Sequence, residues 1–310
     1  MMKRYILFSL LFALPLSLAA QSTIRRPSKP KPKPKVENTK PKPKPKPKHK
    51  SRPLSTSTPQ ATHQSTPQPS PQPAPQITPQ QAELNKLINN MVYVSGGTFT
   101  MGATSEQGSD AYDNEKPTHS VTLSSFYLCK YEVTQALWRA VMGNNPSNFK
   151  GDNLPVEQVS WNDCQTFISR LNNLTGKNFR LPTDAEWEYA ARGGNRSRGY
   201  KYSGSNVLSD VAWYDGNSSD KTHPVGTKSP NELGLYDMSG NVWEWCSDWY
   251  GTYSSSAQTN PTGPSSGSSR VNRGGGWFNV NRNCRSSNRS YDAPDFRDNY
   301  LGLRLTLSQL

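Results

Sequence analysis

Histidine and cysteine, the side chains that most often hold zinc or iron, are scarce in this chain. There are four of each in 310 residues. His49 and His63 lie in the proline-rich first part of the chain, and His119 and His223 are far apart in sequence. Because a His-ligated zinc or iron centre needs two or three clustered imidazoles, such a centre is not expected here.

The cysteines also lack the spacing of known metal or redox motifs. Cys129, Cys164, Cys246 and Cys284 are widely separated, and none belongs to a C-x-x-C pair. This excludes zinc-knuckle and thioredoxin-like patterns. Two disulfides would allow three pairings, and the sequence does not choose between them. Four buried free thiols are the alternative.

No hydrophobic run is long enough for a comfortable membrane span. The longest, 5–18, follows Lys3 and Arg4 and ends in small residues. This order predicts a secretory signal peptide over residues 1–20, with a retained anchor as the alternative. We therefore expect an exported protein, periplasmic, on the outer surface or secreted, with no membrane span after cleavage.

Acidic residues are almost absent from the stretch that gives the chain its net charge of +13. Residues 22–53 contain thirteen Lys and Arg and one acid, a charge of +12, and Lys3 and Arg4 add +2. Residues 54–310 then carry 13 − 12 − 2 = −1. A nearly neutral folded part does not indicate a nucleic-acid partner.

Residues 21–83 lack the hydrophobic residues that a core needs. Lysine alternates with proline up to about residue 50, and Ser, Thr, Gln and Pro follow. Such composition predicts a disordered, extended linker. The lysines could alternatively bind an anionic polymer of the cell envelope.

A folded domain is predicted over residues 84–310. We expect strands at 91–94 and 98–102, paired as a hairpin through Gly96-Gly97, and further strands at 119–123 and 126–131. Capping residues predict three helices, which start after Thr134, Ser160 and Thr183. Two last strands are expected at 273–277 and 299–307.

Tryptophan is concentrated in one segment of the folded part. Trp243, Trp245 and Trp249 fall within seven residues, together with acidic residues that need partners if they are buried. Around this segment stand several short motifs: Tyr131-Glu132-Val133-Thr134, Arg180-Leu181-Pro182-Thr183, Gly240-Asn241-Val242-Trp243-Glu244-Trp245, Arg273-Gly274-Gly275 and Leu301-Gly302-Leu303-Arg304.

In this order the motifs resemble the formylglycine-generating enzyme, or sulfatase-modifying factor, family. The resemblance covers about residues 91–307. It implies a C-type-lectin-like α+β fold with little regular secondary structure.

The resemblance also implies where the family's catalytic cysteines should lie. Family members that oxidise a sulfatase cysteine use two cysteines, copper and oxygen. Asn279 occupies the first of these positions, and residues 280–283 contain no second cysteine. Copper(I) prefers thiolate ligands, so no catalytic residue and no copper site are expected.

A family calcium site is predicted by the same resemblance. Its ligands would be the carboxylates of Asp237 and Glu244 and the backbone carbonyls of Gly240 and Val242. Carboxylate and carbonyl oxygens suit calcium. In the alternative, arginines or backbone N–H groups satisfy the two carboxylates.

Aromatic, amide and charged residues are dense between 277 and 298, and such mixtures suit adaptable recognition. We expect this face to bind a protein or a glycan. The candidate ligand-binding residues are Trp277, Asn279, Asn281, Asn283, Arg285, Asn288 and Arg289. The segment also resembles the variable region of retroelement-diversified lectin-fold proteins.

The sequence thus predicts a non-catalytic binding or structural module of the bacterial cell envelope. One alternative is a formylglycine-generating-type oxidase or another protein-modifying enzyme. The other is a retroelement-diversified ligand-binding protein.

Overall fold

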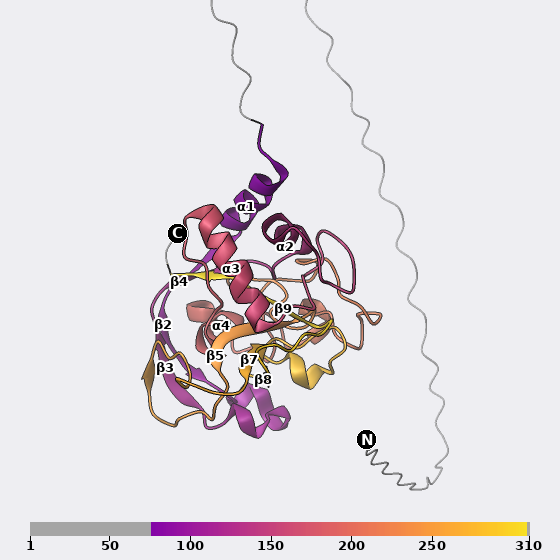
Figure 1. Ribbon diagram of the computed structural model, residues 1–310. Helices are drawn as coiled ribbons and strands as arrows, with labels where there is room; N and C mark the ends of the chain where they lie inside the picture. The colour runs from indigo at the N-terminus through magenta and orange to yellow at the C-terminus, as the bar shows by residue number, and fades with distance from the viewer. Residues whose placement is uncertain (1–75, 309–310) are drawn as a thin grey trace, which may run out of the picture. The chain divides into compact units, whose positions relative to one another are not determined.

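The computed structural model describes residues 76–308, and Figure 1 shows their arrangement. The predicted signal peptide and nearly all of the predicted linker lie outside these residues. The helices are α1 (Pro79–Asn89), α2 (Gln135–Met142), α3 (Trp161–Thr175), α4 (Asp184–Ala191) and α5 (Leu208–Val211). The strands are β1 (Met91–Val94), β2 (Gly97–Met101), β3 (His119–Leu123), β4 (Phe126–Cys129), β5 (Trp243–Trp249), β6 (Gln258–Thr259), β7 (Arg270–Arg273), β8 (Arg289–Asp292), β9 (Leu301–Leu303) and β10 (Thr306–Leu307).

Helix α1 starts before the predicted domain boundary at Leu84. The hydroxyl of Thr78 accepts a hydrogen bond from the backbone N–H of Gln81, and Pro79 occupies the first helical position, where its missing N–H is not needed. Leu84 and Leu87 are buried in the core. The domain therefore includes residues that composition alone had assigned to the linker.

The expected hairpin between β1 and β2 is wrong. Strand β1 pairs with β4 and strand β2 pairs with β3, in two different three-stranded sheets. Both pairings are antiparallel, with Val94 opposite Phe126 and Gly97 opposite Leu123. The chain therefore crosses between the two sheets at Gly96, next to the turn that joins β3 to β4.

The third sheet has the strand order β8-β7-β5-β9 and contains the tryptophan-rich segment as β5. The strand expected at 273–277 is displaced, because β7 ends at Arg273. The strand expected at 299–307 is split. Its first part, β9, lies parallel to β5, and its last part, β10, is antiparallel to β4.

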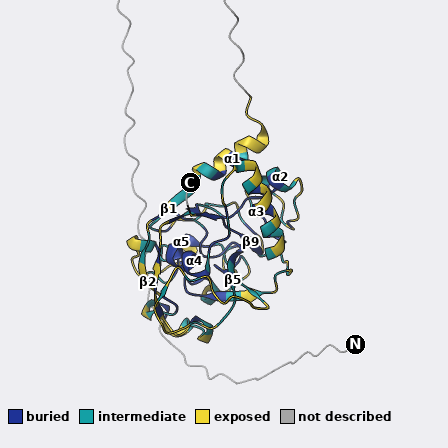
Figure 2. Ribbon diagram, turned by 60° about the vertical axis from the view of Figure 1, so that its left-hand side comes forward, coloured by how far each residue is buried: buried dark blue, intermediate teal, exposed yellow. Residues whose placement is uncertain are grey.

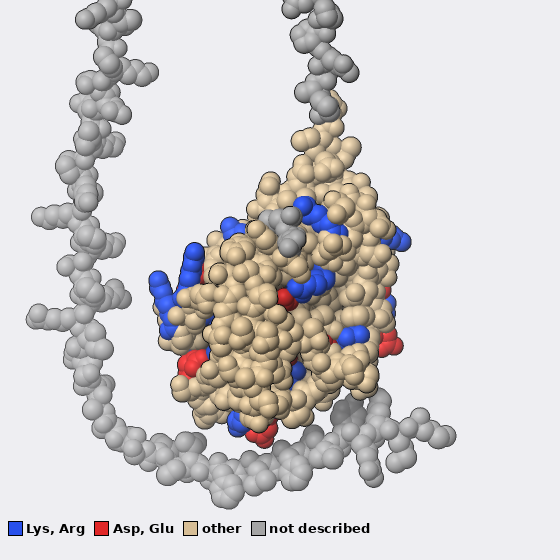
Figure 3. Space-filling view, turned by 90° about the vertical axis from the view of Figure 1, so that its left-hand side faces the viewer, with Lys and Arg blue, Asp and Glu red and all other residues tan. Residues whose placement is uncertain are grey.

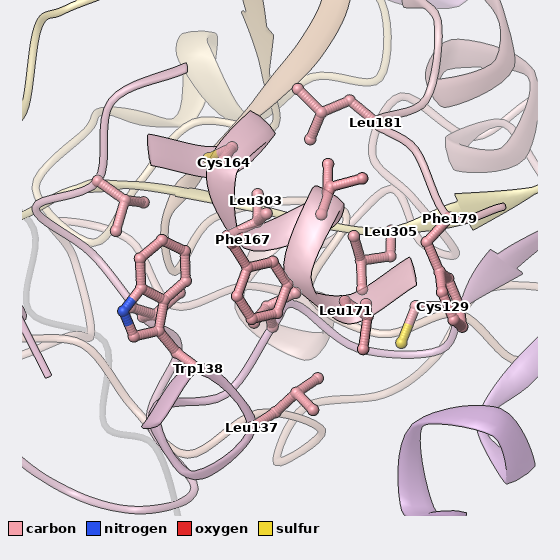
Figure 4. Close-up of a cluster of buried hydrophobic side chains, with 14 of the residues drawn as sticks. Cys129, Leu137, Trp138, Cys164, Phe167, Leu171, Phe179, Leu181, Leu303 and Leu305 are labelled. Carbon is pink, nitrogen blue, oxygen red and sulfur yellow. The ribbon is translucent and has the colours of Figure 1, made fainter. Parts of the chain in front are cut away.

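The three capped helices are confirmed, and each starts at the residue that follows its predicted cap. Thr134, Ser160 and Thr183 each accept a hydrogen bond from the third residue that follows, and the last two form full capping boxes. Helices α2 and α3 meet through the stacked rings of Trp138 and Phe167, whose centroids are 4.8 Å apart. Figure 4 shows these rings among the leucines of the largest buried cluster.

Most of α4 and the centre of β5 are inaccessible to solvent, whereas the outer turns of α1 and α3 are exposed (Figure 2). On the face seen in Figure 3, small groups of acidic and basic side chains are scattered over a largely uncharged surface. Within residues 76–308, no helix has the length and apolar character needed to cross a membrane.

Candidate functional site

The loop after β7 begins with three glycines that make a tight turn. Gly274 and Gly275 have φ values of +98° and +76°, a region that side chains rarely adopt. A Cβ on Gly275 would lie 2.9 Å from the sulfur of Cys284. The turn can therefore pack against Cys284 only with glycine at this position.

Asn279 holds this loop in place. Its side-chain oxygen accepts hydrogen bonds from the indole N–H of Trp243, at 2.7 Å, and from the backbone N–H of Gly276, at 2.8 Å. Its backbone N–H donates to the carbonyl of Gly276, and its own carbonyl accepts from the N–H of Asp215. At the position where the family resemblance would place a catalytic cysteine, the chain has an amide that organises the loop.

The side chain of Asn279 points inward, whereas its two neighbours are exposed. Phe278 is 40% exposed and Val280 is 50% exposed. Phe278 packs on Tyr300, with ring centroids 4.6 Å apart. Val280 and Asn281 line a shallow hollow of about 480 Å³ together with Val207, which is 55% exposed. We call Val207, Phe278, Val280 and Asn281 the 278–281 surface.

Trp277 lies at the edge of this surface and is half-buried. Its indole N–H donates to the carbonyl of Asn299 at 3.1 Å, and its ring packs edge-on against Phe149. Asn283 is also half-buried, and its carbonyl accepts a hydrogen bond from the side chain of Asn288. Trp277, Asn281 and Asn283 are therefore at least partly exposed to solvent, and their role in ligand binding stays a prediction.

Three of the expected ligand-binding residues do not reach the surface, so their assignment to an exposed face is wrong. Arg285 is fully buried and paired with Glu115. Arg289 is 4% exposed, and its guanidinium donates to Asp184 at 2.8 Å and to the carbonyl of Gly251 at 2.7 Å. Asn288 is also buried. These side chains hold the loop to the rest of the domain.

The sequence reasoning missed Val207, Phe278 and Val280. Phe278 and Val280 stand on either side of Asn279 in a loop rich in asparagine. Two apolar residues among polar ones were the signal that could have indicated exposed hydrophobic side chains. Nothing near Val207 in sequence indicated that it would lie beside Val280.

Glu244, one of the predicted calcium ligands, is fully buried. Both oxygens of Glu244 are already engaged. The indole N–H of Trp187 donates to one at 2.7 Å, and the guanidinium of Arg304 bonds to both, with its shortest distance 2.6 Å. Arg304 thus occupies the place of a cation on this carboxylate.

Asp237 has one oxygen that accepts the backbone N–H of Gly226 at 2.6 Å and a second that is buried without a partner. Burial raises the pKa of Asp237 to about 6. In the described part of the chain, no three His, Cys, Asp or Glu side chains are grouped to hold a metal. The donor set therefore does not fit a calcium ion shared by Asp237 and Glu244, and the geometry favours the arginine alternative.

All four cysteines lie within the described residues, and all four are buried free thiols. Cys129 and Cys164 belong to the cluster around α2 and α3, while Cys246 and Cys284 lie in two other clusters. Burial raises the pKa of each thiol, that of Cys284 to about 12. Since the thiolate is the reactive and metal-binding form, burial disfavours reactivity and metal binding at all four sulfurs.

Comparison with solved structures defines the class of the fold. Treponema denticola variable protein 1 superimposes with a TM-score of 0.65 at 34% identity, over 70% of this chain and 94% of that one. PvdO from Pseudomonas aeruginosa gives a TM-score of 0.58 at 28% identity, over 70% and 93%. The fold is the C-type-lectin-like fold of formylglycine-generating enzymes.

Sequence comparison gives the family. Residues 75–309 match the sulfatase-modifying factor enzyme 1-like domain, so the chain belongs to that family. It is 36% identical over 239 residues to the chaperone protein LppX of Paenibacillus barcinonensis, covering 61% of this chain and 79% of that protein. It is 32% identical to the formylglycine-generating enzyme of Streptomyces coelicolor, covering 69% and 87%.

Proposed function

We propose that this protein is an exported, non-catalytic binding module of the cell envelope, and that its 278–281 surface binds a protein or a glycan. One observation carries the proposal. The side-chain oxygen of Asn279 is held in two hydrogen bonds at the position where the family resemblance predicts a catalytic cysteine, and all four thiols are buried. Copper(I) would find no accessible sulfur there.

The exposed side chains support binding at this surface. Val207, Phe278 and Val280 account for three of the seven large hydrophobic residues that are exposed among residues 76–308. Val207 and Val280 line the same hollow, and Asn281 and Asp215 supply polar groups at its rim. Apolar groups with a polar rim are typical of sites that recognise a partner.

The names of two similar proteins also support a binding role. One relative is called a chaperone and one structural neighbour a variable protein, and neither name denotes an oxidation. Four similar proteins, at 29–32% identity, are formylglycine-generating enzymes. Oxidation is therefore the alternative function that experiments must distinguish from binding.

The binding role can be tested by photo-crosslinking in cells. A crosslinking residue at Val280 of the full chain should capture a discrete envelope component, and Phe278→Ser should abolish its capture. The same residue placed at Tyr93 is the control, because Tyr93 is equally exposed but lies on β1. Identical capture from both positions would contradict the proposal.

The oxidase alternative has its own assay. The purified protein, loaded with copper(I) and given a cysteine-containing sulfatase peptide, should consume no oxygen above the buffer rate. Peptide-dependent oxygen uptake with formation of an aldehyde would overturn the non-catalytic assignment.

A further inference from the structure

A second cavity, which shares no residue with the 278–281 surface, lies between the start of α4 and the end of β5. Its volume is about 330 Å³. The start of β3, strand β6 and the loop 251–264 complete its wall. Cavities of this size accept small molecules.

Asp248 places a nearly buried carboxylate in the wall of this cavity. The residue is 3% exposed. One carboxylate oxygen accepts hydrogen bonds from the backbone N–H of Asp184, at 3.1 Å, and from the hydroxyl of Ser247, at 2.8 Å. The other oxygen has no hydrogen-bond partner among residues 76–308, and it is not one of the fully buried unpaired atoms. Since Asp248 lines the cavity, this oxygen can accept a hydrogen bond from a group inside it.

None of the neighbouring cations in the described structure forms an ion pair with Asp248. Arg273 and Arg289 both bond to Asp184, at 2.5 and 2.8 Å. The guanidinium of Arg270 lies over the ring of Trp249, 3.4 Å from its centroid. A cationic group that enters the cavity could therefore form an ion pair with Asp248.

Other lining groups add acceptors and an aromatic surface. The Nδ1 atom of His119 lies 3.3 Å from the carbonyl of Pro117, and the ring contacts Tyr253 edge-on at 4.9 Å. If Nδ1 donates to that carbonyl, the Nε2 atom of His119 is an acceptor. Thr252 and Thr262 are exposed hydroxyl residues that also line the cavity.

We propose that this cavity binds a small organic cation through its alkylammonium group, with the carboxylate of Asp248 as the counter-ion. An ammonium group has three N–H donors and no acceptor, so it can donate to the free oxygen of Asp248 and to hydroxyl oxygens of the lining. Arg289 also lines the cavity, but its guanidinium is already bound to Asp184 and to the carbonyl of Gly251, whereas Asp248 has no ion pair among residues 76–308. A neutral alcohol would leave the charge of Asp248 uncompensated.

The protonation equilibrium of Asp248 agrees with this geometry. Burial, together with the negative charge of nearby Asp184, raises the pKa of Asp248 to about 7. A cation at the unpaired oxygen would stabilise the ionised carboxylate.

The test compares two probes of equal length, n-pentylammonium chloride and 1-pentanol, at pH 8 and constant ionic strength. Binding to the full chain is followed by isothermal titration and by NMR shifts of Tyr253. We expect the ammonium to bind at least about tenfold more tightly than the alcohol, and Asp248→Asn to remove that preference.

The matched control is Glu157→Gln. Glu157 is a buried carboxylate with an unpaired oxygen, and it does not line the cavity. This variant should bind n-pentylammonium like the parent chain. Thr252→Trp, at the exposed mouth, should block binding and serves as the second variant if Asp248→Asn does not fold. Equal affinity for both probes, or unchanged binding in a folded Asp248→Asn chain, would refute the site.

Discussion

Asn279 stabilises the loop that carries the proposed binding surface. Its side chain satisfies an indole N–H and a backbone N–H at once, and a shorter apolar side chain would leave both donors without a partner. It also fixes the direction in which Phe278 and Val280 point. The amide is therefore part of the scaffold that presents the 278–281 surface.

Asn279→Ala should lower the free energy of unfolding by about 1–3 kcal/mol, because two donors lose their acceptor. Urea unfolding followed by tryptophan fluorescence measures the change. Asn281→Ala is the control, because Asn281 is exposed in the same loop and should change stability by less than about 0.5 kcal/mol. Equal effects of the two variants would show that Asn279 does not hold the loop.

The buried ion pair of Arg304 and Glu244 should also contribute strongly to stability. Arg304→Met should lower stability by about 3–5 kcal/mol, because it leaves Glu244 buried without its cation. Arg297→Ala, which breaks an exposed pair with Asp163, should cost no more than about 1 kcal/mol. Chemical denaturation of both variants gives the comparison, and a loss for Arg304→Met no greater than that for Arg297→Ala would contradict it.

The same pair leads to a prediction about calcium. Because the guanidinium of Arg304 holds Glu244, removal of calcium should leave the melting temperature unchanged. Differential scanning calorimetry with excess EDTA and with added calcium measures this. A rise in melting temperature with calcium that Asp237→Asn abolishes would restore the calcium site that the family resemblance implied.

At the scale of elements, the crossing at Gly96 explains how the first two strands enter different sheets. The register of β1 against β4 and that of β2 against β3 belong to one long antiparallel ribbon that is interrupted at Ser95-Gly96. The backbone N–H of Gly96 donates to the hydroxyl of Ser125 at 3.0 Å. Two glycines between short strands suggested a hairpin, but here they permit two chain segments to approach closely.

Gly96→Ala should therefore lower stability by about 2–3 kcal/mol, since its Cβ would lie 2.7 Å from the backbone nitrogen of Ser125. Gly176→Ala is the control. Gly176 ends α3 with a φ of +67° and open space around it, so only the backbone strain of about 1 kcal/mol applies. Thermal and urea unfolding should show a larger loss of stability for Gly96→Ala than for Gly176→Ala. An equal loss of stability would mean that the backbone at Gly96 is not closely packed against Ser125.

At the scale of the whole molecule, buried carboxyls should make stability depend on pH. Burial raises the pKa of Glu157 and of Asp248 to about 7, above the ordinary value near 4 of the unfolded chain. Between these values the folded state binds more protons than the unfolded state, so stability falls as pH rises.

Lowering the pH from 8 to 6 should thus raise the free energy of unfolding by on the order of 2 kcal/mol. Below about pH 4 the trend reverses. Burial alone would raise the pKa of Glu115, but hydrogen bonds from Arg285 and Ser287 hold it below its usual value, so protonation there weakens the fold. Melting curves from pH 3 to 9 test both limbs. The double variant Glu157→Gln and Asp248→Asn should flatten the upper limb, and an unchanged slope would assign the effect to other groups.

The sequence by itself determined the family and the three capped helices, and it predicted that Asn279 stands at the position of a family cysteine. These depend on local signals, such as a capping hydroxyl three residues from its donor or a motif read in order. Only the tertiary structure decided which polar residues are buried and which strands pair. Arg285 forms an ion pair with Glu115 and Arg304 forms one with Glu244, although each partner is distant in sequence. Val207 and Val280 line the same hollow. The physical reason is that a charge or an exposed apolar side chain takes its role from its partner, and in these pairs the partner comes from a distant part of the chain.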